Sequence, residues 1–183
     1  DDQVELNLHE RAHGPHGLVA GTTGSGKSEL LQTLIASLAL GNRPDELNFV
    51  LIDYKGGAAF KDFVKLPHTV GIVTDLDAHL VQRAMDSLGA ELRRREHLLA
   101  TVGAKDIGDF TSARERGETG DKMPRLMLVI DEFAALKAEL PEFVAGIVNI
   151  AQRGRSLGIH LVMATQRPQG AITADILANT NLR

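Results

Sequence analysis

The stretch Gly21-Thr22-Thr23-Gly24-Ser25-Gly26-Lys27-Ser28 lies between an apolar run, residues 17–20, and a helical pattern that starts at Glu29. It fits GxxxxGK[ST], in which backbone N–H groups surround nucleotide phosphates, the Lys reaches the β- and γ-phosphates, and the last hydroxyl binds Mg²⁺. Its glycines permit backbone angles that a Cβ would obstruct. The stretch therefore predicts a nucleotide site formed by residues 21–29, with Ser28 as a magnesium ligand.

The composition favours a single domain. The chain has 183 residues, of which 43% are hydrophobic, enough for one α/β domain with a sizeable core over residues 1–183. It has no Cys, which excludes disulfides and thiolate metal sites and is typical of a reducing cytosolic setting. The net charge of −4 provides no overall basic field for nucleic acid, which weakens a DNA-binding interpretation without excluding it.

The apolar runs are too short for a membrane helix. Residues 126–130 form one of the longest, far below the roughly twenty residues that a bilayer span requires. The chain begins at Asp1 rather than Met, so we expect a domain cut from a longer protein, with any membrane anchor in the missing parts.

Apolar runs alternate with helical patterns along the chain. Strands are expected at residues 17–20, 47–53, 70–74, 126–130 and 159–164, with a further short one at 4–8. Helices are expected at residues 27–40, 58–64, 106–116 and 170–183. A long helix is also expected after a cap at Asp75 or Asp77, and another from Pro141 to Gly158. This alternation predicts an α/β fold, a mostly parallel sheet with helices on both faces and ligands at the carboxyl ends of its strands.

The strand expected at residues 126–130 leads into Asp131 and Glu132, acidic groups of the kind that ATP hydrolysis requires beside a phosphate loop. One carboxylate holds Mg²⁺, and a second polarises the attacking water. We expect Asp131 in the first role and Glu132 in the second. The alternative is a charged pair that marks the point where a strand meets solvent.

A polar segment also follows the strand expected at residues 159–164. Gln166 emerges there, at the same edge of the sheet as the phosphate loop, where it could hydrogen-bond the γ-phosphate or the attacking water. The residues alone leave open whether Gln166 senses hydrolysis or is an ordinary loop residue.

Several segments together resemble the motor domain of the FtsK/SpoIIIE family over nearly the whole chain. In order, they are residues 21–29, Asp53-Tyr54-Lys55-Gly56-Gly57, Leu66-Pro67-His68, Val129-Ile130-Asp131-Glu132-Phe133, Gly154-Arg155-Ser156-Leu157-Gly158-Ile159-His160-Leu161 and Ala164-Thr165-Gln166-Arg167-Pro168. The resemblance implies a RecA-like P-loop ATPase of the additional-strand, catalytic-glutamate type. In that type the fifth strand lies between the phosphate-loop strand and the Asp-Glu strand, which places Gln166 beside the γ-phosphate.

The resemblance also bears on assembly and cargo. Such motors form hexameric rings with ATP between neighbouring subunits. Residues 53–60 and 154–158 are more similar to the type VII secretion branch than to the DNA translocases, which usually carry Asp-Pro-Lys where this chain has Asp53-Tyr54-Lys55. The resemblance thus implies the cytoplasmic domain of a membrane-anchored bacterial protein that moves secreted protein, with double-stranded DNA as the alternative cargo.

An ATPase site between subunits needs an arginine from the neighbour to neutralise charge on the transferred phosphoryl group. Similarity to the secretion ATPases favours Arg83, and similarity to the DNA motors favours Arg183. Arg153 and Arg155 are weaker choices. The triplet at residues 93–95 is expected to be a solvated helix face, with Glu91 and Glu96 close enough to pair with it.

The sequence thus predicts an Mg²⁺-dependent ATPase motor domain that binds ATP and assembles into a hexameric ring. A second alternative is a regulatory domain that binds ATP and hydrolyses it negligibly. The expected partners are further copies of the chain, other domains of the same protein, the cargo, and a membrane reached through parts outside this chain.

Overall fold

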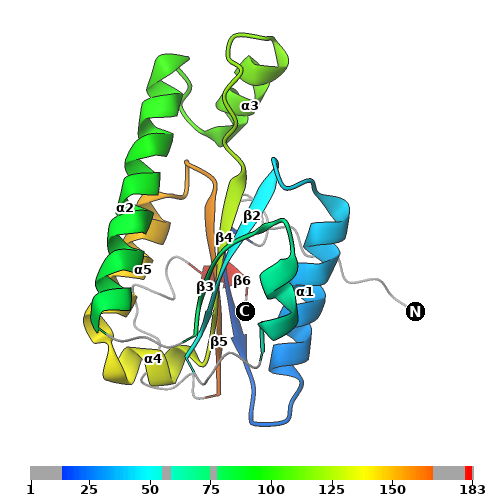
Figure 1. The fold of residues 1–183 in the computed structure, drawn as a ribbon, viewed down its shortest axis with the longest axis vertical. Coiled ribbons are helices and arrows are strands. Elements are labelled where there is room, and N and C mark those ends of the chain that lie inside the picture. Colours follow the sequence, from blue (N-terminus) through cyan, green and yellow to red (C-terminus); the bar gives the residue numbers. More distant parts are fainter. Residues whose placement is uncertain (1–13, 55–58, 75–77, 167–179, 183) are drawn as a thin grey trace.

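The structure is a computed structural model that describes residues 14–54, 59–74, 78–166 and 180–182 (Figure 1). Its strands are β1 (His16–Ala20), β2 (Leu47–Asp53), β3 (Thr69–Val73), β4 (Arg125–Asp131), β5 (Ile159–Thr165) and β6 (Thr180–Leu182). Its helices are α1 (Lys27–Gly41), the 3₁₀ helix η1 (Lys61–Lys65), α2 (Ala78–Thr101), α3 (Ile107–Glu115), α4 (Phe133–Glu139) and α5 (Pro141–Arg153). None of the helices in this part of the chain combines the length and the apolarity that a membrane span requires.

The strands form one sheet in the order β3-β2-β4-β5-β1-β6, and the neighbouring strands are parallel. β5 lies between β1 and β4, which confirms the strand order that the family resemblance implies. Gly17 of β1 is opposite Val162, and Leu126 of β4 is opposite Ile159. The carboxyl ends of β1, β5 and β4 therefore meet at one edge of the sheet.

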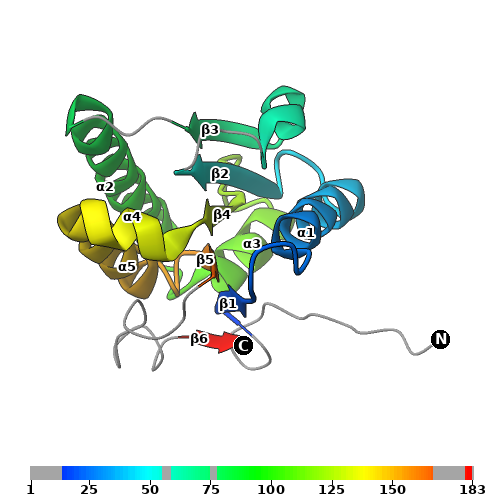
Figure 2. The same cartoon turned by 90° about the horizontal axis from the view of Figure 1, so that it is seen from below.

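Helices cover both faces of the sheet, with α1 on one face and α2, α4 and α5 on the other (Figure 2). The side chains of β4 alternate between these layers. Met127 and Val129 join the core cluster that contains Leu31 of α1, whereas Leu128 and Ile130 join the cluster of the opposite face. Two covered faces explain the unbroken apolar run of β4, because a strand buried on both sides has no polar face.

Most elements lie within two residues of their predicted bounds, and the exceptions have physical reasons. α5 begins at Pro141 as predicted but ends at Arg153, and the chain then turns through Gly158, whose φ of 74° favours glycine. Residues 180–182 form β6, which pairs with the edge of β1, so the helix predicted to reach residue 183 is wrong there. The sequence predicts no helix where α4 forms, and the short helix predicted at residues 58–64 is the 3₁₀ helix η1. The predicted strand at residues 4–8 and the caps Asp75 and Asp77 lie outside the described residues.

Arg95 on α2 is buried, with 1% of its surface exposed, so the prediction of a solvated arginine face is wrong at this position. Its Nη1 donates to the carbonyl oxygen of Leu157 at 2.7 Å, and its Nη2 donates to that of Pro124 at 2.6 Å. Its Nε donates to Glu91 at 2.7 Å. Burial lowers the pKa of Arg95, and the Glu91 carboxylate opposes this shift. Arg95 thus fastens α2 to the segments that lead into β4 and β5.

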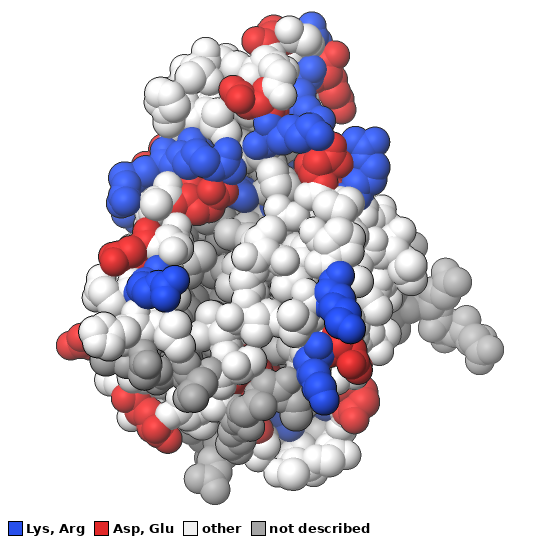
Figure 3. Space-filling model, in the orientation of Figure 1, with Lys and Arg blue, Asp and Glu red and all other residues white. Residues whose placement is uncertain are grey.

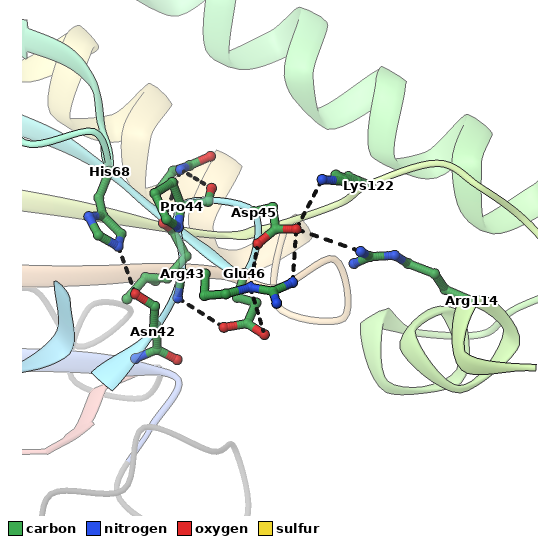
Figure 4. Close-up of polar contacts among 10 residues, drawn as sticks. Asn42, Arg43, Pro44, Asp45, Glu46, His68, Arg114 and Lys122 are labelled. Carbon is green, nitrogen blue, oxygen red and sulfur yellow. Dashed lines mark hydrogen bonds and ion pairs between the residues drawn. The ribbon is translucent and has the colours of Figure 1, made fainter. Parts of the chain in front are cut away.

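A group of charged side chains lies around the half-buried Asp45 at the amino ends of the strands (Figure 4). Asp45 accepts hydrogen bonds from Arg43 Nε at 3.0 Å and Lys122 Nζ at 3.0 Å, and Arg114 lies 3.7 Å away. These contacts join the α1–β2 turn to α3 and to the segment before β4. Figure 3 shows that acidic and basic side chains lie intermixed over the α2 and α3 end of this face of the molecule.

Candidate functional site

The phosphate loop connects the carboxyl end of β1 to the start of α1. Gly24 and Gly26 have φ values of 76° and 85°, which favour glycine. A Cβ on Gly21 would lie 2.5 Å from Ser25 Oγ, so the loop closes tightly there. α1 begins at Lys27 without a side-chain cap, which leaves its first N–H groups directed toward the loop. This geometry suits an anion.

Lys27 lies beneath the loop with 8% of its surface exposed. Its Nζ donates to the carbonyl oxygen of Thr22 at 2.8 Å, which is its only partner in the described part of the chain. A buried ammonium satisfied by a single neutral oxygen is well suited to bind phosphate oxygens, because it retains donors and charge for them.

Asp131 at the end of β4 is brought against the loop. Ser28 Oγ donates to its Oδ2 at 3.0 Å, and the backbone N–H of Glu132 donates to its Oδ1 at 2.9 Å. Asp131 is 5% exposed and lies opposite Asp53, which is also buried, in the β2–β4 register. Burial raises the pKa of Asp131; the Glu132 and Asp53 carboxylates add to this shift, whereas the two hydrogen bonds oppose it.

Glu132 follows with a φ of 56°, a left-handed conformation that few residues other than glycine adopt. It is the N-cap of α4, directly before Phe133. Its carboxylate accepts a hydrogen bond from Gln166 Nε2, and Gln166 Oε1 accepts one from Thr23 Oγ1 at 2.9 Å. Backbone strain at an acidic residue that lies close to the ends of β1 and β5 is typical of a functional position.

The position of β5 explains why Gln166 can reach both neighbours. β5 pairs with β1 and with β4, so the residue that follows it lies between the phosphate loop and Glu132. A backbone hydrogen bond of 3.2 Å from Gly21 to Thr165 ties the loop to the end of β5. The structure thus brings together the predicted residues 21–28, Asp131, Glu132 and Gln166.

Sequence reasoning missed the contacts that follow β2. Tyr54 donates its hydroxyl to Glu139 at the end of α4. Asp53 Oδ2 accepts from the N–H of Ala59 at 3.0 Å, and Gln32 of α1 donates to the carbonyl oxygen of Ala59 at 2.8 Å. An acidic residue at the end of a second strand, as at Asp131, is the signal that could have indicated this part of the site.

The candidate arginines are not part of this constellation. Arg83 lies exposed on α2, and no described residue pairs with it. Glu96, predicted to pair with the triplet at residues 93–95, pairs with Arg153 of α5 at 3.2 Å instead. Glu91 pairs with Arg94 at 2.7 Å as predicted. Arg183 lies outside the described residues.

A concavity of about 370 Å³ lies at the opposite end of the sheet, beside the Asp45 group. Arg43, Arg114 and Arg125 are among the residues that line it, and none of the sequence-predicted site residues does. The phosphate loop and the β4 end remain the candidate functional site.

Comparison with known proteins agrees with this geometry. The model of the FtsK/SpoIIIE family matches residues 1–170. The chain belongs to the FtsK/SpoIIIE family. Its strand order and phosphate loop are those expected of a P-loop ATPase of this family.

Similar proteins include components of secretion systems. The chain is 48% identical to the ESX secretion system protein EccC of Geobacillus thermodenitrificans, over all of this chain but only 12% of that protein. The cytoplasmic domain of the Thermomonospora curvata type VII secretion ATPase EccC has a TM-score of 0.89 and 41% identity, covering 97% of this chain and 21% of that one. The same organism's EccC (ATPases 2 and 3), in complex with a signal sequence peptide, has a TM-score of 0.81 and 31% identity, covering 93% and 30%.

Proposed function

We propose that this chain is an Mg²⁺-dependent ATPase motor domain of a type VII secretion protein, working in a hexameric ring. The observation that carries the proposal is the convergence of Ser28, Asp131 and Glu132. The hydroxyl and the first carboxylate are in contact at 3.0 Å, and the second carboxylate follows at once in the chain. This is the pairing of a phosphate loop with two acidic groups that ATP hydrolysis requires.

The residues present fit a magnesium ion. Mg²⁺ prefers oxygen ligands and is usually bound by one or two carboxylates together with substrate phosphates. Ser28 and Asp131 supply such oxygens at one point. Burial raises the pKa of Asp131, and a nearby cation would favour its ionised form. When bound, the ion would neutralise charge on the β- and γ-phosphates.

The other residues have separate roles in the proposal. Lys27 and the loop N–H groups hold the phosphates, and Glu132 takes up the proton of the attacking water. Gln166 holds Glu132 and donates to the γ-phosphate or to the water. Arg83 of a neighbouring subunit supplies the positive charge at the phosphoryl group, with Arg183 as the alternative.

Secreted protein is the proposed cargo. The relatives named above are type VII secretion proteins, and one of them is bound to a signal sequence peptide. The chain spans about an eighth of the length of its full-length relative, so the activity of the whole protein and its anchoring to a membrane are part of the proposal.

Two structures of the same relative also bear on the chain's place within the longer protein. Identity is 41% to the cytoplasmic domain of Thermomonospora curvata EccC but 31% to ATPases 2 and 3 of that protein alone. We infer that the chain corresponds to a part of the cytoplasmic domain outside ATPases 2 and 3. Locating the chain within its own full-length sequence tests this, and a position in the second or third ATPase domain would overturn it.

Substitution of the proposed base tests the catalytic assignment. Glu132→Gln in the assembled full-length protein should lower ATP turnover about 100- to 10,000-fold while ATP still binds. Glu142→Gln is a matched control on the exposed first turn of α5 and should retain turnover. Unchanged turnover in Glu132→Gln would show that another group activates the water.

Arg83→Ala tests the contribution of the neighbouring subunit. It should spare ATP binding by the monomer and remove the turnover that appears on assembly. Arg183→Ala provides the comparison, and a loss confined to that variant would move the role to Arg183.

Two further measurements separate the alternatives. Turnover per subunit should rise with protein concentration if the ring is the enzyme, whereas a regulatory module that only binds ATP should stay inactive at every concentration. Strong stimulation by duplex DNA would favour a DNA translocase over a secretion motor.

A further inference from the structure

Two hydroxyl groups of the phosphate loop reach the carboxylates at the end of β4. Ser28 bonds to Asp131 directly. Thr23 reaches Glu132 through Gln166, whose amide lies between them. The first link belongs to the proposed magnesium site. The second joins Thr23 of the loop to the proposed base.

The chemistry of this second link fixes how the Gln166 amide is turned. A glutamine amide has an oxygen that only accepts and a nitrogen that only donates, and an ionised carboxylate only accepts. Because the Glu132 carboxylate only accepts, Nε2 is directed to it, and Oε1 on the other side accepts from the Thr23 hydroxyl at 2.9 Å. The reversed amide would set its oxygen against the Glu132 carboxylate, where two acceptors repel.

The same arrangement leaves one N–H of Gln166 for another acceptor. Nε2 carries two hydrogens, and Glu132 is its only partner in the described part of the chain. Since Gln166 lies between the loop and Glu132, the second N–H can serve a phosphoryl oxygen or the attacking water.

We propose that the Thr23 side chain positions groups for hydrolysis, because its hydroxyl acts through Gln166 rather than on ATP itself. Its hydroxyl holds the amide so that one N–H keeps Glu132 in place and the other meets the reacting group. This inference rests on the proposed function, because it takes Glu132 as the base. The exposed position of Thr23 at the tip of the loop means that its side chain can be changed without opening the core.

Thr23→Val and Thr23→Ser in the assembled full-length protein test the proposal. Valine keeps the shape of the side chain and removes the hydroxyl, so kcat should fall about tenfold, the effect of one lost hydrogen bond, while the Kd for ATP stays within about twofold. Serine keeps the hydroxyl and should restore kcat. A Kd that weakens as much as kcat falls would make Thr23 a nucleotide ligand and would overturn the proposal.

A double-mutant cycle with Gln166→Ala shows whether the effect passes through the amide. Thr23→Val should cost nothing further once Gln166 has lost its amide, since coupled residues are not additive. If the double variant instead combined the full losses in kcat of both single variants, the proposal would be overturned. Full turnover in Glu132→Gln would instead defeat the proposed function, so the two failures are distinguishable.

Discussion

The two ends of the sheet differ in how their charged side chains are paired. At the carboxyl end, buried Asp131 and Asp53 lie side by side, and the buried ammonium of Lys27 meets a carbonyl oxygen. At the amino end, Asp45 is shared by Arg43 and Lys122, and Glu91 is shared by two arginines.

The difference shows in the pKa values. Burial raises the pKa of Asp131, whereas hydrogen bonds from Arg43 and Lys122 lower the pKa of Asp45 to about 2. Among the described residues, Lys27 and Asp131 form no ion pair and remain available to a ligand, whereas the charges at the amino end pair with one another and join the elements together. The contrast identifies which end of an α/β sheet is built for a ligand.

The largest expected effect is the loss of ATP binding in Lys27→Ala. The ammonium would make charge-assisted bonds to phosphate, so its removal should weaken the Kd for ATP at least about 100-fold. Equilibrium binding of labelled ATP measures this, and Lys61→Ala on the exposed η1 is the control. Near-normal binding in Lys27→Ala would mean that the carboxyl end is not the ligand end.

Next in size is the loss of stability in Arg95→Leu. The carbonyl oxygens of Leu157 and Pro124 would lose buried donors, so the free energy of unfolding should fall by about 3 kcal/mol. Urea denaturation measures this change. Arg93→Leu, on the exposed face of the same helix, should change it by less than about 0.5 kcal/mol. Equal effects would show that Arg95 adds no more than its exposed neighbour.

Asp131→Asn should stabilise the protein without nucleotide by about 1 kcal/mol while turnover is lost. Asn can still accept from Glu132 N–H and can donate to Ser28 Oγ, so only the buried charge disappears. A raised pKa in the folded state means that the wild-type carboxyl weakens stability as pH rises. The difference in the free energy of unfolding between wild type and Asp131→Asn should therefore disappear below pH 3.8, the ordinary pKa of the group. A destabilised Asp131→Asn would contradict this interpretation.

Asp45→Asn should have the smallest effect on stability, because Arg43 and Lys122, which form ion pairs with Asp45, are exposed to solvent. The lowered pKa of Asp45 means that its contribution is present above pH 3.8 and is lost as pH falls toward 2. The difference from wild type should also shrink at about 1 M salt. A difference that ignores both pH and salt would show that Asp45 acts by packing rather than by charge.

The parts of the molecule that depend on local pattern could be predicted from the sequence. The phosphate loop, with its spaced glycines, has the expected conformation, and the apolar run of β2 has the predicted bounds, Leu47–Asp53. The place of Asp131 beside the phosphate loop could be predicted because an acidic strand end is expected next to such a loop. The contact of Ser28 with Asp131 follows from that pairing.

The parts of the molecule that depend on contacts between distant residues could not be predicted from the sequence. In the sequence, Arg95 is one of three adjacent arginines that all favour a solvated position. Its burial depends on hydrogen bonds to carbonyl groups 29 and 62 residues away. β6 forms because β1 has an open edge, and no periodicity in three residues can show this. The place of Gln166 depends on where β5 enters the sheet, which the family resemblance supplied and the residues alone left open.

The hydrogen bond from Tyr54 to Glu139 also has a spectroscopic consequence. Tyr54 is the chain's one tyrosine, and there is no tryptophan, so near-ultraviolet absorption and emission arise almost wholly from this phenol. Glu139 raises the pKa of Tyr54, and Glu139→Gln should return it toward 10.0 in an absorbance titration. Because Glu139 ends α4, the helix that directly follows Glu132, the phenol is an intrinsic optical probe, one helix away from the proposed base, that requires no added label.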